Sequence, residues 1–411
     1  MSTHPRPSEP AVPSGTPRLT AHIPGLDGLR ALACLAVFGV HWQQFTGWAG
    51  AWGPFDLKRL LENGNTGVSL FFTLSAFLLS IRFWTGSWGR PGEPWVRRYV
   101  LSRATRILPA YYTCVLALVV LTGPLTSPRG LADAGLHFAF VHNFWERSFY
   151  SLSPPFWTIA VQVQSYVLMP ILLLLVLRST GRFATRAWVL GGLTVASYLV
   201  HWASLALGPG GAAGNGMTAW AAGRPTVATH SVLAHAPHFL LGLLAGLVYV
   251  RRVAGGGAAA GTGMRLAVGE LSVWLAALVI LVILATPLDD WFSIPYGRYN
   301  LPVVPLLITW IILEAPRTRL ARWVLDAAPL RLLGVISYGV YVYHYPGMQA
   351  VQKAMEAAGL PVGHHWAVFA AASLALAIIV SALSFRLLEA PLARVGRRRP
   401  SGKTTPAPAP G

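Results

Sequence analysis

Apolar runs close to the length of a membrane span recur along the whole chain. A helix needs about 20 predominantly apolar residues to cross the hydrocarbon core of a bilayer. Hydrophobic residues make up 54% of the sequence and charged residues only 11%, against about 25% charged in an ordinary soluble domain. We therefore expect an all-α fold, a polytopic membrane helical bundle of about ten transmembrane helices. The approximate spans are 29–48, 67–84, 108–126, 156–177, 188–207, 236–250, 271–288, 299–313, 333–351 and 366–388.

The basic residues are distributed unevenly between the connections. Most of the 32 Lys and Arg residues fall on alternate connections or on the two ends, and the positive-inside rule assigns such segments to the cytoplasm. We therefore expect a multi-pass protein of the cell membrane with both termini cytoplasmic. A nucleic-acid binder would instead gather its basic residues on one soluble face, so we expect no nucleic-acid partner. The same basic surface favours anionic membrane lipids or a phosphate-bearing substrate.

The chain divides into three parts by composition. Residues 1–22 are rich in Pro and Ser and lack the apolar core of a cleavable signal peptide, so we expect a disordered cytoplasmic tail. Residues 23–392 contain the spans and form the membrane domain. Residues 393–411 are basic and then Pro-rich, which predicts a second cytoplasmic tail.

Two ionisable residues occupy the first apolar run. Arg30 and His41 are about three helical turns apart, so their side chains share one face, roughly 16 Å apart along the axis. Arg30 either extends to the membrane interface or contacts a substrate. His41 lies deeper, where ionisable groups usually face a cavity, a polar partner or a reaction site. A structural histidine with a hydrogen-bond partner is the alternative for His41.

Six segments resemble, in order, the motifs of membrane acyltransferase family 3. Members of this family transfer acyl groups, often acetyl, to sugars and other hydroxylated molecules. The segments are IPGLDGLRALACLAVFGVHW, GVSLFFTLSAFLLSIRFW, YVLSRATRILPAYY, SLSPPFWTIAVQVQSYVLMP, LGVISYGVYVYHYP and FRLLEAPL. Two positions depart from the family pattern: Ala76 stands where glycine is usual, and Gln162 stands where the family often has glutamate.

The resemblance implies an integral-membrane O-acyltransferase with no permanently bound cofactor. Its donor would be cytoplasmic acyl-CoA, acetyl-CoA in the first instance, and its acceptor a hydroxyl of a carbohydrate or glycosylated small molecule. Guanidinium groups bind phosphate bidentately, and a neutral histidine can take the acceptor proton. The catalytic candidates are His41 and, second, His344. The substrate-binding candidates are Arg30, Ser75, Arg103, Arg106, Trp157, Gln162 and Tyr338.

Other roles for the polar residues stay open. Gln162 cannot act as a carboxylate base, and the resemblance places it near His41. Arg386 and Glu389 have the spacing of an intrahelical ion pair. The histidine pairs lack a Cys, Asp and His framework, so we expect no metal site. A non-catalytic transporter or flippase is the alternative function, with the buried polar groups lining a translocation path.

The family also varies in its domain content. Some members carry an additional extracytoplasmic hydrolase-like domain after the membrane region. This chain ends soon after its last apolar run, so we expect transfer to be completed by the membrane domain or by a separate partner.

Overall fold

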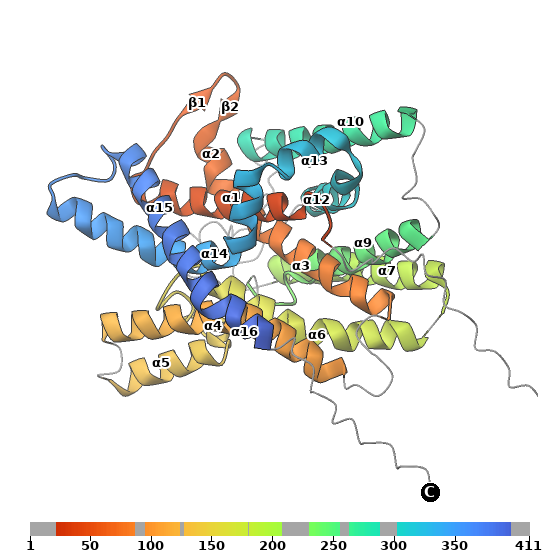
Figure 1. Cartoon of the computed structure of the whole chain (residues 1–411), viewed down its shortest axis with the longest axis horizontal. Helices are drawn as coiled ribbons and strands as arrows, with labels where there is room; N and C mark the ends of the chain where they lie inside the picture. The colour runs from red at the N-terminus through yellow and green to blue at the C-terminus, as the bar shows by residue number, and fades with distance from the viewer. Residues whose placement is uncertain are drawn as a thin grey trace, which may run out of the picture.

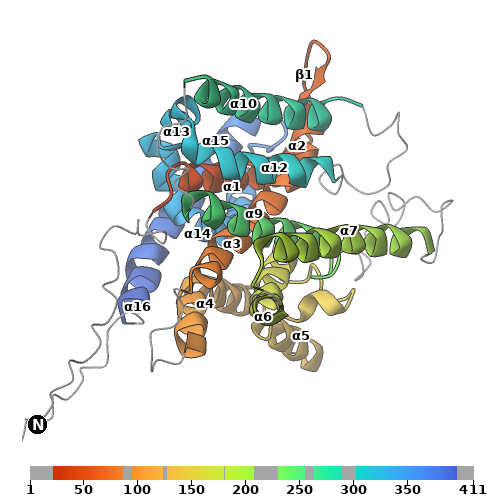
Figure 2. The ribbon, with the colours of Figure 1, turned by 90° about the vertical axis from the view of Figure 1, so that its right-hand side faces the viewer.

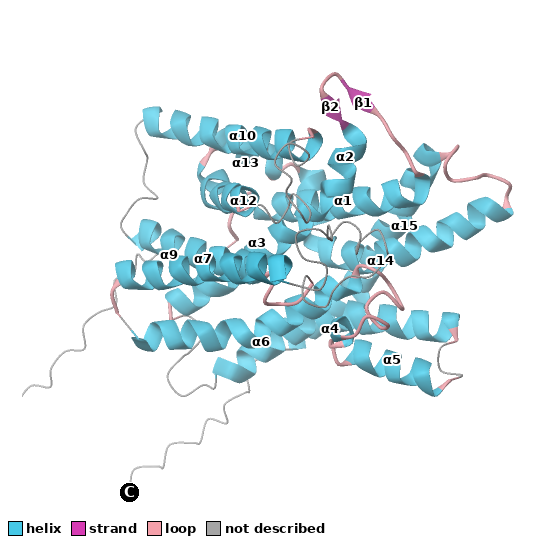
Figure 3. Cartoon of the chain, turned by 180° about the vertical axis from the view of Figure 1, so that it is seen from behind, coloured by secondary structure: helices cyan, strands magenta, loops and turns pink. Residues whose placement is uncertain are grey.

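The structure is a computed structural model, and it describes residues 22–86, 95–123, 127–179, 181–207, 230–254, 263–287 and 302–395. The expected tails at 1–22 and 393–411 therefore lie largely outside the described residues. The described residues are helical apart from one two-stranded hairpin, β1 (Ala51–Trp52) and β2 (Phe55–Asp56), and short connections. Figure 3 shows this hairpin standing at one end of the bundle.

The α-helices follow the order of the apolar runs along the chain. Those before residue 180 are α1 (Leu26–Thr46), α2 (Leu57–Glu62), α3 (Thr66–Trp84), α4 (Trp95–Thr122), α5 (Pro128–Phe138) and α6 (Phe156–Ser179). The later ones are α7 (Phe183–Leu207), α9 (Ala236–Ala254), α10 (Gly263–Ala285), α12 (Val303–Glu314), α13 (Arg319–Leu325), α14 (Ala328–Ala357), α15 (Trp366–Ser384) and α16 (Ala390–Val395). Three short 3-10 segments are η1 (Asn63–Asn65), η3 (His142–Phe144) and η5 (Ala315–Arg317), and η6 (Phe385–Glu389) is a π-helix.

Helix α1 lies in the middle of the bundle, between α3 and α14 (Figures 1 and 2). Helix α9 packs along α3, and α15 packs along α14. Helix α10 lies at the periphery over α12, with most of its apolar side chains facing outward. In the most apolar window of each helix, 72% of the α2–α3 residues are buried but only 11% of the α10 residues. The outer helices therefore present their apolar surface where lipid would lie.

The all-α membrane bundle is confirmed, and the count of about ten spans stays approximate. Within the described residues, seven helices are long and apolar enough to cross a membrane, or eight if the pair α13 and α14, bent by 63°, counts as one broken span. The two other expected spans correspond to α1 and α12. Helix α12 has only 12 residues. Helix α1 has the length, at 21 residues, but carries several polar side chains.

Glycines allow the close packing of α1 against its neighbours. A Cβ atom at Gly67 of α3 would overlap the carbonyl oxygen of Ala33, and one at Gly334 of α14 would overlap that of Asp27. Small residues of this kind let helix backbones approach each other inside membranes. Both contacts fix the rotation of α1, so they decide where Arg30 and His41 point.

Helix α5 runs back along the second half of α4 (Figure 1). The hydroxyl groups of Tyr111 and Tyr112 donate to the carbonyl oxygens of His137 (3.2 Å) and Phe138 (2.9 Å). The next turn contains Phe140 with φ of 56°, the one positive φ outside glycine in the described residues. Such a conformation costs about 1–3 kcal/mol. It is held by stacking of the Phe140 ring on Tyr111, with centroids 4.6 Å apart.

The expected ion pair between Arg386 and Glu389 does not form. These residues lie in the π-helix η6, whose wider turn separates the side chains of residues three apart. The Glu389 side chain is instead buried, and Arg106 of α4 acts on it electrostatically. The prediction from spacing was wrong because it assumed regular α-helical geometry.

Candidate active site

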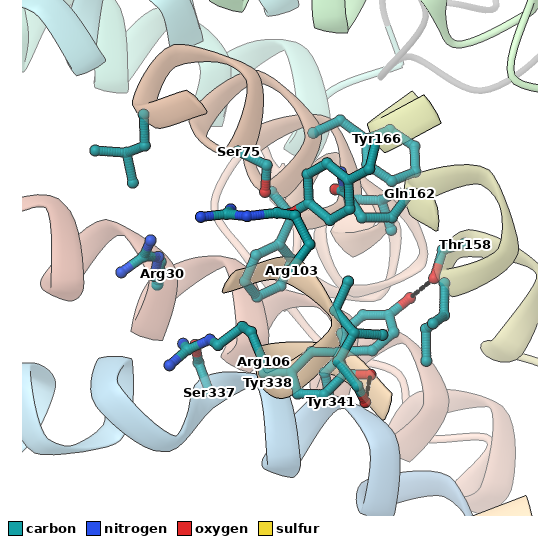
Figure 4. Close-up of a pocket in the computed structure, with 16 residues that line it drawn as sticks. Arg30, Ser75, Arg103, Arg106, Thr158, Gln162, Tyr166, Ser337, Tyr338 and Tyr341 are labelled. Carbon is teal, nitrogen blue, oxygen red and sulfur yellow. Dashed lines mark hydrogen bonds between the residues drawn. The ribbon is translucent and has the colours of Figure 1, made fainter. Parts of the chain in front are cut away.

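A first cavity, here called the cationic cavity, lies between α1, α3, α4, α6 and α14 and has a volume of about 130 Å³. Arg30, Arg103 and Arg106 line it, and Figure 4 shows their guanidinium groups on one side of it. Val68, Phe71 and Ile107 add apolar surface, and Ser75, Gln162 and Tyr338 add polar atoms. The cavity therefore combines a cationic end with a largely apolar interior.

The positive charge in the cationic cavity is only partly neutralised. Arg30 donates to the Asp27 carboxylate at 2.8 Å. Arg103 donates to the Ser102 hydroxyl at 3.3 Å and lies over the Tyr166 ring. Arg106 makes no hydrogen bond or ion pair to another described residue. Cationic groups converging with so little compensation are suited to bind an anionic ligand such as a phosphate.

A second cavity, here called the histidine cavity, has a volume of about 290 Å³ and contains His41 in its wall. Its polar lining includes His41 and Gln44 of α1, Asn65 of η1 and His230. Its aromatic lining comes from Tyr150 and Trp157. The Trp157 ring packs against Phe149 and His230, with centroids 6.0 and 4.6 Å away.

The hydrogen bond between His41 and Gln44 defines which ring nitrogen of His41 carries the proton. The His41 Nδ1 atom lies 2.9 Å from the Oε1 atom of Gln44. An amide oxygen only accepts hydrogen bonds, so Nδ1–H is the donor and Nε2 of the neutral ring carries a free lone pair. His41 is therefore held in the tautomer that can take up a proton at Nε2. Gln44 was not singled out from the sequence, although its i,i+3 spacing from His41 was visible.

His344 lies behind His41 and lines neither cavity. Its ring centroid is 5.2 Å from that of His41, and its Nδ1 atom donates to the Tyr341 carbonyl at 2.7 Å. The ring is 1% exposed. His344 is therefore placed to support the His41 ring rather than to touch a ligand, together with Tyr345, which meets His41 edge-on.

The two cavities share three lining residues: Val68, Thr158 and Tyr341. The Oγ1 atom of Thr158 and the Oη atom of Tyr341 are 2.6 Å apart across this boundary, as the dashed line in Figure 4 marks. The cavity lined by Arg30 lies on one side of this boundary, and the cavity lined by His41 lies on the other side. The expectation that Arg30 and His41 share one face of their helix is thus consistent with the structure, which gives each its own cavity along that face.

The sequence candidates separate into two groups in space. Six line the cationic cavity: Arg30, Ser75, Arg103, Arg106, Gln162 and Tyr338. Trp157 lines the histidine cavity with His41. The assumed proximity of Gln162 to His41 is not found, because the Gln162 amide bonds to Ser165 at 3.1 Å and faces the other cavity. Gln162 follows Trp157 by five residues, which at about 100° per residue turns its side chain by about 140° and so towards a different cavity.

Two tyrosine hydroxyl groups of α14 form hydrogen bonds with backbone carbonyl groups of α4. Tyr338 donates to the Ile107 carbonyl at 2.9 Å, so its hydroxyl fixes α14 to α4 while its ring lines the cationic cavity. Tyr343 donates in the same way to Ala110 at 3.2 Å. These bonds hold the arginines of α4 against α14.

The segment between α5 and α6 is anchored by Gln164, which the sequence reasoning did not assign a role. Its amide donates to the Phe140 carbonyl at 3.0 Å and to the Asn143 side chain at 2.8 Å. Nearby, the rings of His137 and His142 stack with centroids 3.9 Å apart. Burial, with a smaller contribution from His137, lowers the pKa of His142 to about 3. This segment leads directly to Tyr150, so it positions one wall of the histidine cavity.

Comparison with known proteins places this geometry in a family. The sequence profile described as "Acyltransferase domain" matches residues 23–386. The chain is 25% identical over 393 residues to the peptidoglycan O-acetyltransferase OatA of Listeria monocytogenes, covering 91% of this chain and 56% of OatA. It is 27% identical over 381 residues to BcsY of Komagataeibacter xylinus, a candidate membrane-bound transacylase, covering 89% of this chain and 81% of BcsY.

A third relative is YrhL of Bacillus subtilis, a candidate peptidoglycan O-acetyltransferase, at 26% identity over 92% of this chain and 56% of that protein. The chain thus spans about half the length of two of these relatives. No solved structure matches it. The match over nearly the whole membrane region shows that the chain belongs to the acyltransferase-domain family of multi-pass membrane proteins.

Proposed function

We propose that this chain is an integral-membrane O-acyltransferase that moves an acyl group, acetyl in the first instance, from acyl-CoA to a hydroxyl of a carbohydrate or glycosylated small molecule. The single observation that carries the proposal is the meeting of the two cavities at Thr158 and Tyr341. One cavity offers cations and the other a histidine with a free lone pair.

The donor would bind with its anionic end at the arginines. Acyl-CoA carries phosphates, which suit the guanidinium groups of Arg30, Arg103 and Arg106, and a thioester at the end of a long, mostly uncharged arm. The apolar lining beyond the arginines, which includes Phe71 and Ile107, would accommodate that arm. The thioester would then lie at the boundary between the cavities.

The acceptor would bind in the histidine cavity. Aromatic rings such as Trp157 and Tyr150 provide flat apolar surface for a sugar ring, and the side chains of Gln44 and Asn65 provide hydrogen-bonding partners for hydroxyl groups. The relative OatA is named for acetylating peptidoglycan, a polymer of this chemical class.

The transfer would follow the proton arrangement of His41. Its Nε2 atom takes the proton of the acceptor hydroxyl as the oxygen attacks the thioester carbonyl, which must lie within about 3–3.5 Å. The C–O bond forms, the C–S bond breaks, and the thiolate of CoA leaves with the proton that His41 returns. Gln162 faces the donor in this scheme, so a glutamine there does not remove the base.

The orientation follows from the charge bias. With both termini and the basic connections in the cytoplasm of a cell-membrane protein, Arg103 and Arg106 would meet a cytoplasmic donor, and the basic connections would meet anionic lipids. Helix α1 would then lead from the donor side towards the opposite face, where His41 lies.

Labelled acetyl-CoA separates this function from transport. Purified chain in lipid nanodiscs would be incubated with [¹⁴C]acetyl-CoA and either N-acetylhexosamine oligosaccharides or a glycosylated small molecule. Acylated acceptor from the wild type, and none from His41→Ala with the same CoA binding, supports the enzyme. A transporter or flippase would instead move an acceptor across proteoliposome membranes without modifying it, and that result would contradict the proposal.

A further inference from the structure

The boundary between the cavities is narrow and chemically fixed. Val68, Thr158 and Tyr341 are all buried, with exposures of 5%, 4% and 7%. The Phe71 ring packs edge-on against Tyr341, with centroids 5.6 Å apart. The wall that the two cavities share is therefore built from side chains packed in the protein interior.

The hydrogen bonds at this boundary have a defined direction. The hydroxyl of Thr158 donates to the Pro155 carbonyl at 2.8 Å, so its only hydrogen is already used. The contact with Tyr341 must then run from the Tyr341 hydroxyl to the Thr158 oxygen, at 2.6 Å. Because the Tyr341 proton is held in this bond, the pair is suited to fix the position of a ring rather than to exchange protons.

We infer that Thr158 and Tyr341 select the acyl group by size, admitting acetyl and excluding longer straight chains. The inference rests on the proposed function, since a thioester anchored at the arginines can meet a hydroxyl beside His41 only at this boundary. The acyl carbon must be reached from the histidine cavity, so the acyl tail has to fit beside the Tyr341 ring. Each additional methylene would have to displace that ring or Thr158.

Two features make the inference specific to this pair. The other polar residues of the cationic cavity, such as Ser75 and Gln162, line that cavity alone and do not form its boundary. Val68, the third shared residue, has an apolar side chain and takes no part in the hydrogen bond that joins Thr158 to Tyr341. Thr158 lies on α6 and Tyr341 lies on α14, and the two residues are joined through their side chains. Either side chain can therefore be replaced without changing the backbone of its helix.

The test uses a series of acyl-CoA donors with one acceptor. The purified chain in nanodiscs would be assayed with acetyl-, propionyl-, butyryl- and hexanoyl-CoA, and kcat/KM compared. One methylene in a tight pocket typically changes kcat/KM by about 10- to 200-fold, so acetyl-CoA should exceed butyryl-CoA by at least about tenfold. Thr158→Ala, which removes two side-chain heavy atoms and the bond to Tyr341, should raise the butyryl-to-acetyl ratio by about tenfold or more.

Thr158→Ser keeps the hydroxyl and both hydrogen bonds but removes one methyl group, so it should raise the ratio less than Thr158→Ala does. If Thr158→Ala does not fold, Tyr341→Phe keeps the ring and removes the bond, and should also raise the ratio. The size selection alone would be overturned if a folded Thr158→Ala or Tyr341→Phe protein kept the wild-type butyryl-to-acetyl ratio while transfer from all donors slowed in parallel. Absence of transfer from every donor by the wild type would overturn the proposed function and this inference with it.

Discussion

The contact between Gln44 and His41 gives a prediction with a defined sign. Replacing Gln44 by Glu puts a carboxylate where the amide oxygen now accepts from Nδ1 of His41, at 2.9 Å. A negative charge there stabilises the imidazolium and opposes the neutral, proton-accepting form. The acid limb of the pH–rate profile should therefore move to higher pH.

The size of this shift follows from the position of Gln44. Two unit charges 2.9 Å apart interact by about 1.4 kcal/mol at the dielectric constant of water and by about 6 kcal/mol at an effective value near 20. Because Gln44 is exposed towards the open histidine cavity, the lower figure is the better guide. About 1.4 kcal/mol corresponds to about one pH unit, so the shift should be at least of that order.

The chain provides its own control for this experiment. Gln162→Glu makes the same chemical change in the cationic cavity, away from His41, and should leave the acid limb in place. Initial rates of acetyl transfer, measured at saturating donor from about pH 5 to about pH 9, would give both profiles. If Gln44→Glu is active and its profile overlays that of the wild type, or if Gln162→Glu produces the larger shift, the assignment of His41 as the base paired with Gln44 is wrong.

Four further outcomes are expected. His41→Ala should lower the rate of acyl transfer by about 10²–10⁴, the usual loss for a positioned base, with unchanged acetyl-CoA binding by calorimetry. Arg106→Ala should weaken acetyl-CoA binding by about 10- to 100-fold, because a bond to a charged group is lost, whereas Arg97→Ala, outside both cavities, should not. Gly67→Ala should destabilise the folded protein by about 1–3 kcal/mol through overpacking, seen as a lower Tm in detergent. Acidification from about pH 7 to about pH 5 should lower the free energy of unfolding by about 2 kcal/mol through His142, because this residue binds a proton near pH 6.5 in the unfolded chain and only near pH 3 in the folded chain. The decrease in the free energy of unfolding should be smaller in His142→Asn.

The sequence predicted the parts of the site that lie on one element. Arg30 and His41 could be assigned to one face from their spacing, because helical periodicity is local. The apolar runs predicted most helices for the same reason. The arginines of α4 and the histidine of α14 were found through motif resemblance rather than through any calculation of position.

The sequence could not predict contacts between distant elements. Thr158 and Tyr341 are far apart in the chain, and only the fold of the bundle brings their hydroxyl oxygens to 2.6 Å from each other. The same holds for Gln164 and the turn at Phe140. Gln162 was placed near His41 without any distance between α1 and α6, whereas in the structure its side chain lines the cationic cavity and not the histidine cavity.

The composition of α1 accounts for its place in the bundle. Asp27, Arg30, His41 and Gln44 would be costly to expose to hydrocarbon, since unsatisfied polar groups there lose their water. Surrounding α1 with α3 and α14 gives these groups protein partners and cavities instead, and it leaves the purely apolar faces of helices such as α10 to the outside. Helix α1 is not among the helices apolar enough to cross a membrane, and it carries His41, the base of the proposed function. Its polar side chains, which suit it least to face lipid, include the ones that line the two cavities.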